Sequence, residues 1–96
     1  MSESDAVSPD ARPRLPRGVR LRHDEARGEW MLLGPERVLK LDGIALEILK
    51  RCDGETSFRA LIADLAESFK ADAAVIEKDV SAFLNEMRNR AMVEIA

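Results

Sequence analysis

The chain has 96 residues, of which 46% are hydrophobic, and a formal net charge of −3 at pH 7. This length is enough for one small domain with a single hydrophobic core. Its one cysteine and one histidine exclude an internal disulfide framework and a structural zinc site of the usual kind, and no apolar run is long enough to span a membrane. We therefore expect a metal-free, soluble protein of the reducing cytoplasm.

Charge is unevenly distributed along the chain. Residues 12–40 carry eight basic and four acidic side chains, a net charge of +4, whereas residues 41–96 carry seven basic and eleven acidic ones, a net charge of −4. Such asymmetry is typical either of a solvated sheet face or of a surface that attracts an acidic partner.

Residues 1–16 contain three prolines and few large apolar side chains. Because burial of so little apolar surface cannot offset the entropy of ordering them, we predict a disordered N-terminal tail or linker. The folded domain is then expected over residues 17–96.

Three strands are predicted in the first half of that domain, at about residues 18–23, 29–34 and 37–41, where apolar residues alternate or cluster between turn signals. Gly34-Pro35 sets the turn before the third strand. Short loops between the strands predict an antiparallel meander in which the third strand keeps one free edge.

The first helix is predicted over about 43–52, capped by Asp42 and ended by Asp53-Gly54. Its apolar arc, which should face the core, comprises Ile44, Ala45, Ile48, Leu49 and Cys52. Leu46 lies roughly 120° from the centre of this arc. It is either a boundary side chain covered by its neighbours or part of a binding groove.

Two further helices are predicted over about 57–70, after a cap at Thr56 or Ser57, and over about 73–91, after Asp72. Core stripes at helical spacing run along both, from Phe58 to Phe69 and from Ile76 to Ala91. Residues 92–96 fit a short closing strand or the frayed end of the last helix. The expected fold class is α+β, with a three-stranded antiparallel meander followed by a three-helix bundle.

No set of side chains suited to catalysis is evident. His23 is the only imidazole, Cys52 falls in the apolar arc of its helix, and the five glycines lie at turns and helix ends rather than in a phosphate-binding loop. We therefore expect neither an enzyme nor a cofactor.

Two binding functions remain. A winged-helix DNA-binding regulator also combines three helices with a small sheet. However, the second and third predicted helices each carry equal numbers of basic and acidic residues, so neither has the net positive charge that favours contacts with DNA phosphates. A peptide-binding module would use strand addition, in which an extended peptide completes the free edge of strand 37–41 beside the first helix. Arg37 and Lys40 would protect this edge from self-association and attract carboxylates.

Several short motifs occur together: Pro16-Arg17-Gly18-Val19-Arg20-Leu21, Arg27-Gly28 before Trp30, Leu33-Gly34-Pro35-Glu36-Arg37, Leu41-Asp42, Ile48-Leu49, Cys52-Asp53-Gly54, Asp79-Val80 and Phe83-Leu84. With them, residues 14–92 resemble the PqqD family, small proteins of pyrroloquinoline quinone (PQQ) biosynthesis that act as precursor-peptide recognition domains. The resemblance implies a winged-helix-like fold, no catalysis, and binding of the precursor peptide PqqA for delivery to the radical SAM enzyme PqqE, which joins a glutamate to a tyrosine within the peptide.

The family's binding mode places the peptide against eight residues of this chain. They are Arg37, Val38, Leu39, Lys40 and Leu41 on the pairing strand and Leu46, Leu49 and Lys50 on the first helix. Leu49 also belongs to the predicted core arc. Some relatives are fused to PqqC, and the proline-bearing first 16 residues fit either such a linker or the start of a free-standing protein.

Overall fold

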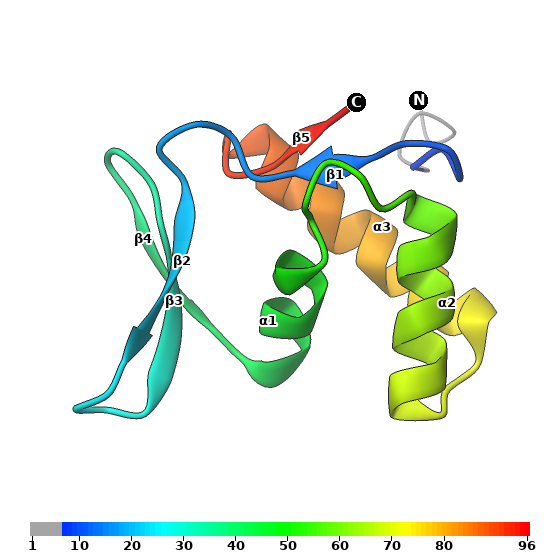
Figure 1. Ribbon diagram of the computed structural model, residues 1–96, viewed down its shortest axis with the longest axis horizontal. Helices are drawn as coiled ribbons and strands as arrows, with labels where there is room; N and C mark the ends of the chain where they lie inside the picture. Colours follow the sequence, from blue (N-terminus) through cyan, green and yellow to red (C-terminus); the bar gives the residue numbers. More distant parts are fainter. Residues whose placement is uncertain (1–6) are drawn as a thin grey trace.

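The computed structural model describes residues 7–96 and contains a small antiparallel sheet beside three helices (Figure 1). The elements in chain order are β1 (Pro13–Arg14), β2 (Arg20–Asp24), β3 (Glu29–Leu33), β4 (Val38–Leu41), α1 (Gly43–Lys50), α2 (Phe58–Phe69), α3 (Ala73–Asn89) and β5 (Glu94–Ile95). The predicted α+β class is confirmed. No helix in the described part of the chain is long and apolar enough to cross a bilayer.

The three-stranded sheet has the order β2-β3-β4, so β3 is paired on both sides. Leu32 of β3 lies opposite Leu21 of β2 and Leu39 of β4, and this leucine row packs against the helices. Leu32 is fully buried, which fixes the register because a slip by one residue would turn the row to solvent.

The helices begin at the capping residues that the sequence predicted. The side chains of Asp42, Ser57 and Asp72 accept hydrogen bonds from the main-chain N–H groups of Ala45, Ala60 and Ala74, at 2.8, 3.1 and 2.9 Å. The buried helical side chains are Ala45, Ile48, Leu49, Phe58, Leu61, Ile62, Leu65, Val80, Leu84 and Met87. The apolar stripes of α2 and α3 therefore form the core with α1, as predicted.

Three residues of the predicted stripes are not in the core: the exposed Ala91, which lies beyond the end of α3, and the large side chains of Ile44 and Phe69. Ile44 is 51% exposed and Phe69 is 42% exposed. Ile44 lies in the first turn of α1 and Phe69 in the last turn of α2, at helix ends that the neighbouring elements leave partly uncovered. The expectation that both face the core is wrong for this reason.

The prediction of a disordered tail is wrong for residues 7–16; residues 1–6 lie outside the described part. Val7, Ala11 and Pro13 are buried. We call residues 7–14 the N-terminal strap, because they cross the start of α2, accepting main-chain hydrogen bonds from Phe58 at Ala11 and from Arg59 at Pro9, at 2.7 and 3.0 Å. These distant partners supply the stabilisation that the segment's own composition lacks.

The strap ends in β1, which pairs antiparallel with β5 (Figure 1). The N–H of Arg12 also donates to the carbonyl oxygen of Ala96 at 2.8 Å, and Met92 and Val93 are each 1% exposed. Ala91, with a φ of 62°, turns the chain out of α3. Of the two alternatives for residues 92–96, the structure therefore has the short closing strand.

Cys52 is expected to be chemically inert in the folded protein. Its side chain is 5% exposed, its thiol donates to the carbonyl oxygen of Ile48 at 3.4 Å, and burial, with a smaller effect of Asp53, raises its pKa to about 12. Because the thiolate is the nucleophile, reaction with a disulfide reagent at pH 8 should be at least about a hundredfold slower than in the urea-unfolded chain. A thiol assay in both states checks this; equal rates would contradict it.

Candidate functional site

The outer edge of β4 carries unpaired main-chain groups. The N–H of Gly34 donates to the carbonyl oxygen of Arg37 at 2.8 Å, which starts the β3–β4 ladder. Hydrogen-bonded and non-hydrogen-bonded pairs then alternate, so Leu39 and Leu41 bond to β3 whereas the N–H and C=O groups of Val38 and Lys40 point away from it. No strand among residues 7–96 pairs with that edge. It can therefore accept an added strand.

Side chains on β4 alternate between two environments. Leu39 and Leu41 are half-buried against the core, while Val38 is 63% exposed. Lys40 is exposed, and its Nζ lies 3.4 Å from Oε2 of Glu29 on the neighbouring strand. The inward leucines hold β4 on the helices, and the outward residues leave its edge accessible.

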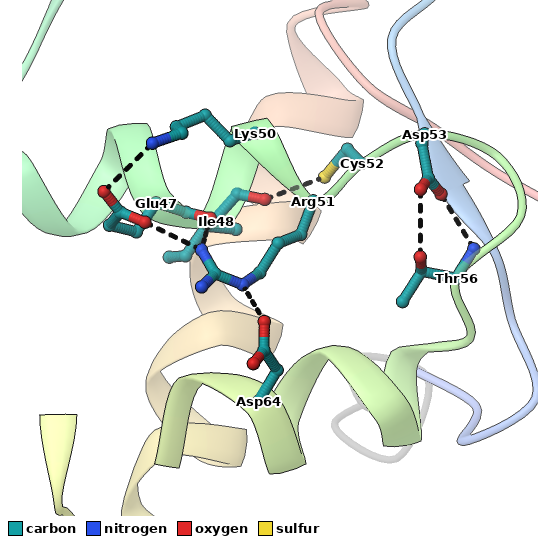
Figure 2. A network of polar contacts seen from close by, with 8 residues as sticks. All are labelled: Glu47, Ile48, Lys50, Arg51, Cys52, Asp53, Thr56 and Asp64. Atoms are coloured by element: carbon teal, nitrogen blue, oxygen red, sulfur yellow. Dashed lines mark hydrogen bonds and ion pairs between the residues drawn. The ribbon is translucent and has the colours of Figure 1, made fainter. Parts of the chain in front are cut away.

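A polar network fixes the end of α1 against α2 (Figure 2). The guanidinium of Arg51 donates to Oε1 of Glu47 at 2.8 Å, to the Glu47 carbonyl oxygen at 2.7 Å, and to Oδ2 of Asp64 on α2 at 2.6 Å. The hydrogen bond to the Glu47 carboxylate, and after it the bond to the Asp64 carboxylate, raise the pKa of Arg51, and the bond that Glu47 accepts from Arg51 lowers the pKa of Glu47. The network sets the spacing between the two helices.

The loop after α1 is ordered by its own aspartate. Asp53 accepts hydrogen bonds from the N–H of Thr56 at 2.8 Å and from its hydroxyl at 3.0 Å (Figure 2). It also accepts one from the N–H of Glu55 at 2.9 Å. The bonds from the Glu55 and Thr56 main chain lower the pKa of this carboxyl. Gly54, with a φ of 80°, completes the turn into α2.

A cavity of about 240 Å³ lies between the three helices, beginning at Asp42 directly after β4. Its wall is mainly apolar and includes Ile44 of α1 and Phe69 of α2. From α3 it includes Ile76 and Phe83, and the carboxylates of Asp42 and Asp79 also line it. We call it the apolar cavity; it is large enough for one apolar side chain of a ligand.

The structure brings some of the predicted site residues together and separates others. Arg37 to Leu41 form one continuous edge. On α1, Leu46 is half-buried, Leu49 is 1% exposed in the core, and the exposed Lys50 lies 3.4 Å from the Glu47 carboxylate. None of these three lines the apolar cavity.

None of the ten residues that line the apolar cavity is among the predicted site residues, and four of the ten are the large apolar side chains of Ile44, Phe69, Ile76 and Phe83. All four were assigned to the core because their spacing fits a helical stripe. Of these four residues, Ile44 could most easily have been recognised from the sequence, because an apolar side chain in the first turn of a short helix has few neighbours to cover it.

Comparison with known proteins decides the family. The family model for "Coenzyme PQQ synthesis protein D (PqqD)" matches residues 29–93, from β3 to the end of α3 and beyond. The chain belongs to the PqqD family. The PqqA binding protein of Rhodopseudomonas palustris (strain BisB5) is 47% identical over 89 residues, which cover 93% of this chain and 87% of that protein. The PqqA binding protein of Xanthomonas axonopodis pv. citri (strain 306) is 43% identical over 89 residues, 93% and 97% of the two chains.

Two solved structures share this PqqD fold. The solution NMR structure of the PqqD truncation of Methylobacterium extorquens PqqCD superposes with a TM-score of 0.78 at 41% identity, covering 96% of this chain and 98% of that one. That truncation is described as a functional, stand-alone recognition element for a ribosomally synthesized and post-translationally modified peptide. The crystal structure of PqqD from Xanthomonas campestris gives a TM-score of 0.54 at 45% identity, covering 88% and 94%.

Proposed function

We propose that this PqqD-family protein binds the precursor peptide PqqA by strand addition and presents it to the radical SAM enzyme PqqE in PQQ biosynthesis. The observation that carries the proposal is the unpaired edge of β4, which runs directly into the apolar cavity. Relatives of high identity are named PqqA binding proteins, and the M. extorquens domain is a peptide recognition element; both support a peptide as the ligand.

In the proposed complex, PqqA forms a fourth strand. Its main chain bonds the outward N–H and C=O groups of Val38 and Lys40, which gives affinity without dependence on sequence. One of its apolar side chains enters the apolar cavity between Ile44, Phe69 and Phe83. That burial supplies the specificity that a main-chain ladder lacks.

The remaining predicted contacts have different roles in this arrangement. Arg37 and Lys40 lie beside the added strand and attract its carboxylates, whereas Leu39 and Leu41 support it from beneath. On α1, Leu46 and Lys50 are accessible enough to touch a peptide, and the buried Leu49 acts by holding the helix in place.

The protein itself performs no chemistry in this proposal. Among residues 7–96, no three His, Cys, Asp or Glu side chains gather in a way that would hold a metal ion. The reaction is left to PqqE, and association with PqqC follows the fused PqqCD of M. extorquens. We place this step in the cytoplasm, where a ribosomally made peptide is first available.

Amide chemical-shift mapping with the PqqA of the same genome tests the proposal. The largest changes are expected at Val38 and Lys40 on β4 and around the apolar cavity at Ile44 and Phe83. A scrambled peptide of the same composition is the control and should leave those signals unchanged. Changes confined to the edge of β2, or none at all, would show that β4 is not the pairing strand.

A further inference from the structure

A second cavity, of about 220 Å³, lies at the opposite end of β4 from the apolar cavity. Three arginines line it: Arg17 before β2, Arg37 before β4, and Arg90 at the end of α3. Its other lining residues are Val19, Pro35, Glu36, Ala91 and Met92. We call it the arginine cavity.

Two of these arginines have no ion-pair partner among residues 7–96. Arg90 is paired with Glu86, Nη2 to Oε2 at 2.9 Å, but Arg17 and Arg37 make no ion pair in the part of the chain that the structure describes. Glu36 is the one carboxylate in the lining. A guanidinium presents its N–H groups as a planar fork that matches a carboxylate, so the free pair is suited to bind one.

The cavity is held by tight turns. The main-chain bond from Gly34 to Arg37 closes the β3–β4 hairpin at 2.8 Å, and Val19 donates to the carbonyl oxygen of Pro16 at 3.0 Å. Gly18, with a φ of 85°, completes the turn that carries Arg17. The backbone positions of both free arginines are therefore set before a ligand arrives, which reduces the entropy lost on binding.

The cavities at the two ends of β4 thus differ in the sign of the net charge of their lining residues. The arginine cavity has more cations than anions in its lining, whereas the apolar cavity has two carboxylates, Asp42 and Asp79, and no cation. Five strand steps separate Arg37 from Asp42, or roughly 17 Å at about 3.3 Å per residue. One extended segment of five to six residues can span both cavities.

We propose that the β4 site selects a peptide segment with a large apolar residue followed, about five residues later, by an aspartate or glutamate, whose carboxylate is bound by Arg17 and Arg37. This proposal rests on the proposed function, since it specifies the ligand of the same edge. The order follows from antiparallel addition, which continues the pattern of the sheet: the peptide's N-terminal end then lies at Asp42 and its C-terminal end at Arg37.

The test measures the affinity of PqqA by fluorescence anisotropy, using peptides in which each acidic residue is replaced in turn by its amide. One replacement should weaken binding about tenfold, because it removes a charge-assisted hydrogen bond. Arg37→Gln should weaken binding of unmodified PqqA similarly and make the protein insensitive to that replacement. Arg20→Gln, which removes an exposed arginine of β2 outside the lining, is the matched control and should bind as the wild type does.

Three results would count against parts of the scheme, and they are distinguishable. If every amide-substituted peptide binds within about twofold of PqqA, the carboxylate contact is wrong although peptide binding stands. If a peptide with the apolar and acidic residues exchanged binds more tightly, the antiparallel direction is wrong. If unmodified PqqA does not bind at all, the proposed function itself fails.

Discussion

A chain shortened to begin at Leu15 should lose roughly 3–5 kcal/mol of its free energy of unfolding. The deletion removes main-chain hydrogen bonds made by the strap at Pro9, Ala11, Arg12 and Pro13. Each such bond contributes about 1 kcal/mol net, and the buried Val7, Ala11 and Pro13 add apolar contacts, offset in part by the entropy of ordering the segment. Since small domains are stable by about 5–15 kcal/mol, the loss would be a large share of the total.

Urea unfolding followed by circular dichroism measures this loss. The matched control is Asp10→Asn, which leaves the strap in place and removes only the ion pair between Asp10 and Arg59, at 3.3 Å. Both side chains of that pair are more than 60% exposed, so the change should be within about 0.5 kcal/mol. A shortened chain that unfolds at the same urea concentration as the full chain would show that the strap does not stabilise the domain.

Val38→Pro should weaken binding of PqqA at least about tenfold while the domain stays folded. Proline removes the outward N–H of Val38, which in the proposed complex donates to the peptide, and its ring crowds the added strand. The ladder to β3 uses Leu39 and Leu41, so no hydrogen bond within the sheet is lost. Calorimetric titration measures the affinity, and amide spectra of the free variant report its fold.

The matched control for this variant is Val38→Ala, which keeps the amide and shortens the same exposed side chain. It should bind PqqA within about threefold of the wild type, because Val38 is 63% exposed and its side chain lies on the outer sheet face. If the proline and alanine variants bind equally well, the peptide does not pair with β4 at this residue.

The sequence predicted the elements of the central domain to within about two residues at most boundaries. Helix α2 was expected over 57–70 and spans Phe58–Phe69, and β4 was expected over 37–41 and spans Val38–Leu41. These segments are specified locally, by apolar periodicity and by caps such as Asp42 and Ser57, and local signals can be read without knowing the tertiary arrangement.

The features that sequence did not predict depend on distant contacts. The strap is ordered by Gly54, Phe58 and Ala96, which are more than forty residues away from it, and its own composition gives no sign of them. The apolar cavity needs the ends of α1 and α2 and the first half of α3 at a particular spacing, which Arg51 and Asp64 help to set. The open edge of β4 was predictable because a three-stranded meander must leave its last strand unpaired on one side.

The ribbon of β1 and β5 has a consequence for how this domain can be joined to larger machinery. It brings both ends of the described chain to the top of the molecule in Figure 1, while α1 begins at the bottom. A module tethered through either terminus would attach on that side, close to the arginine cavity, whose lining residues Ala91 and Met92 shortly precede β5, and away from the start of α1.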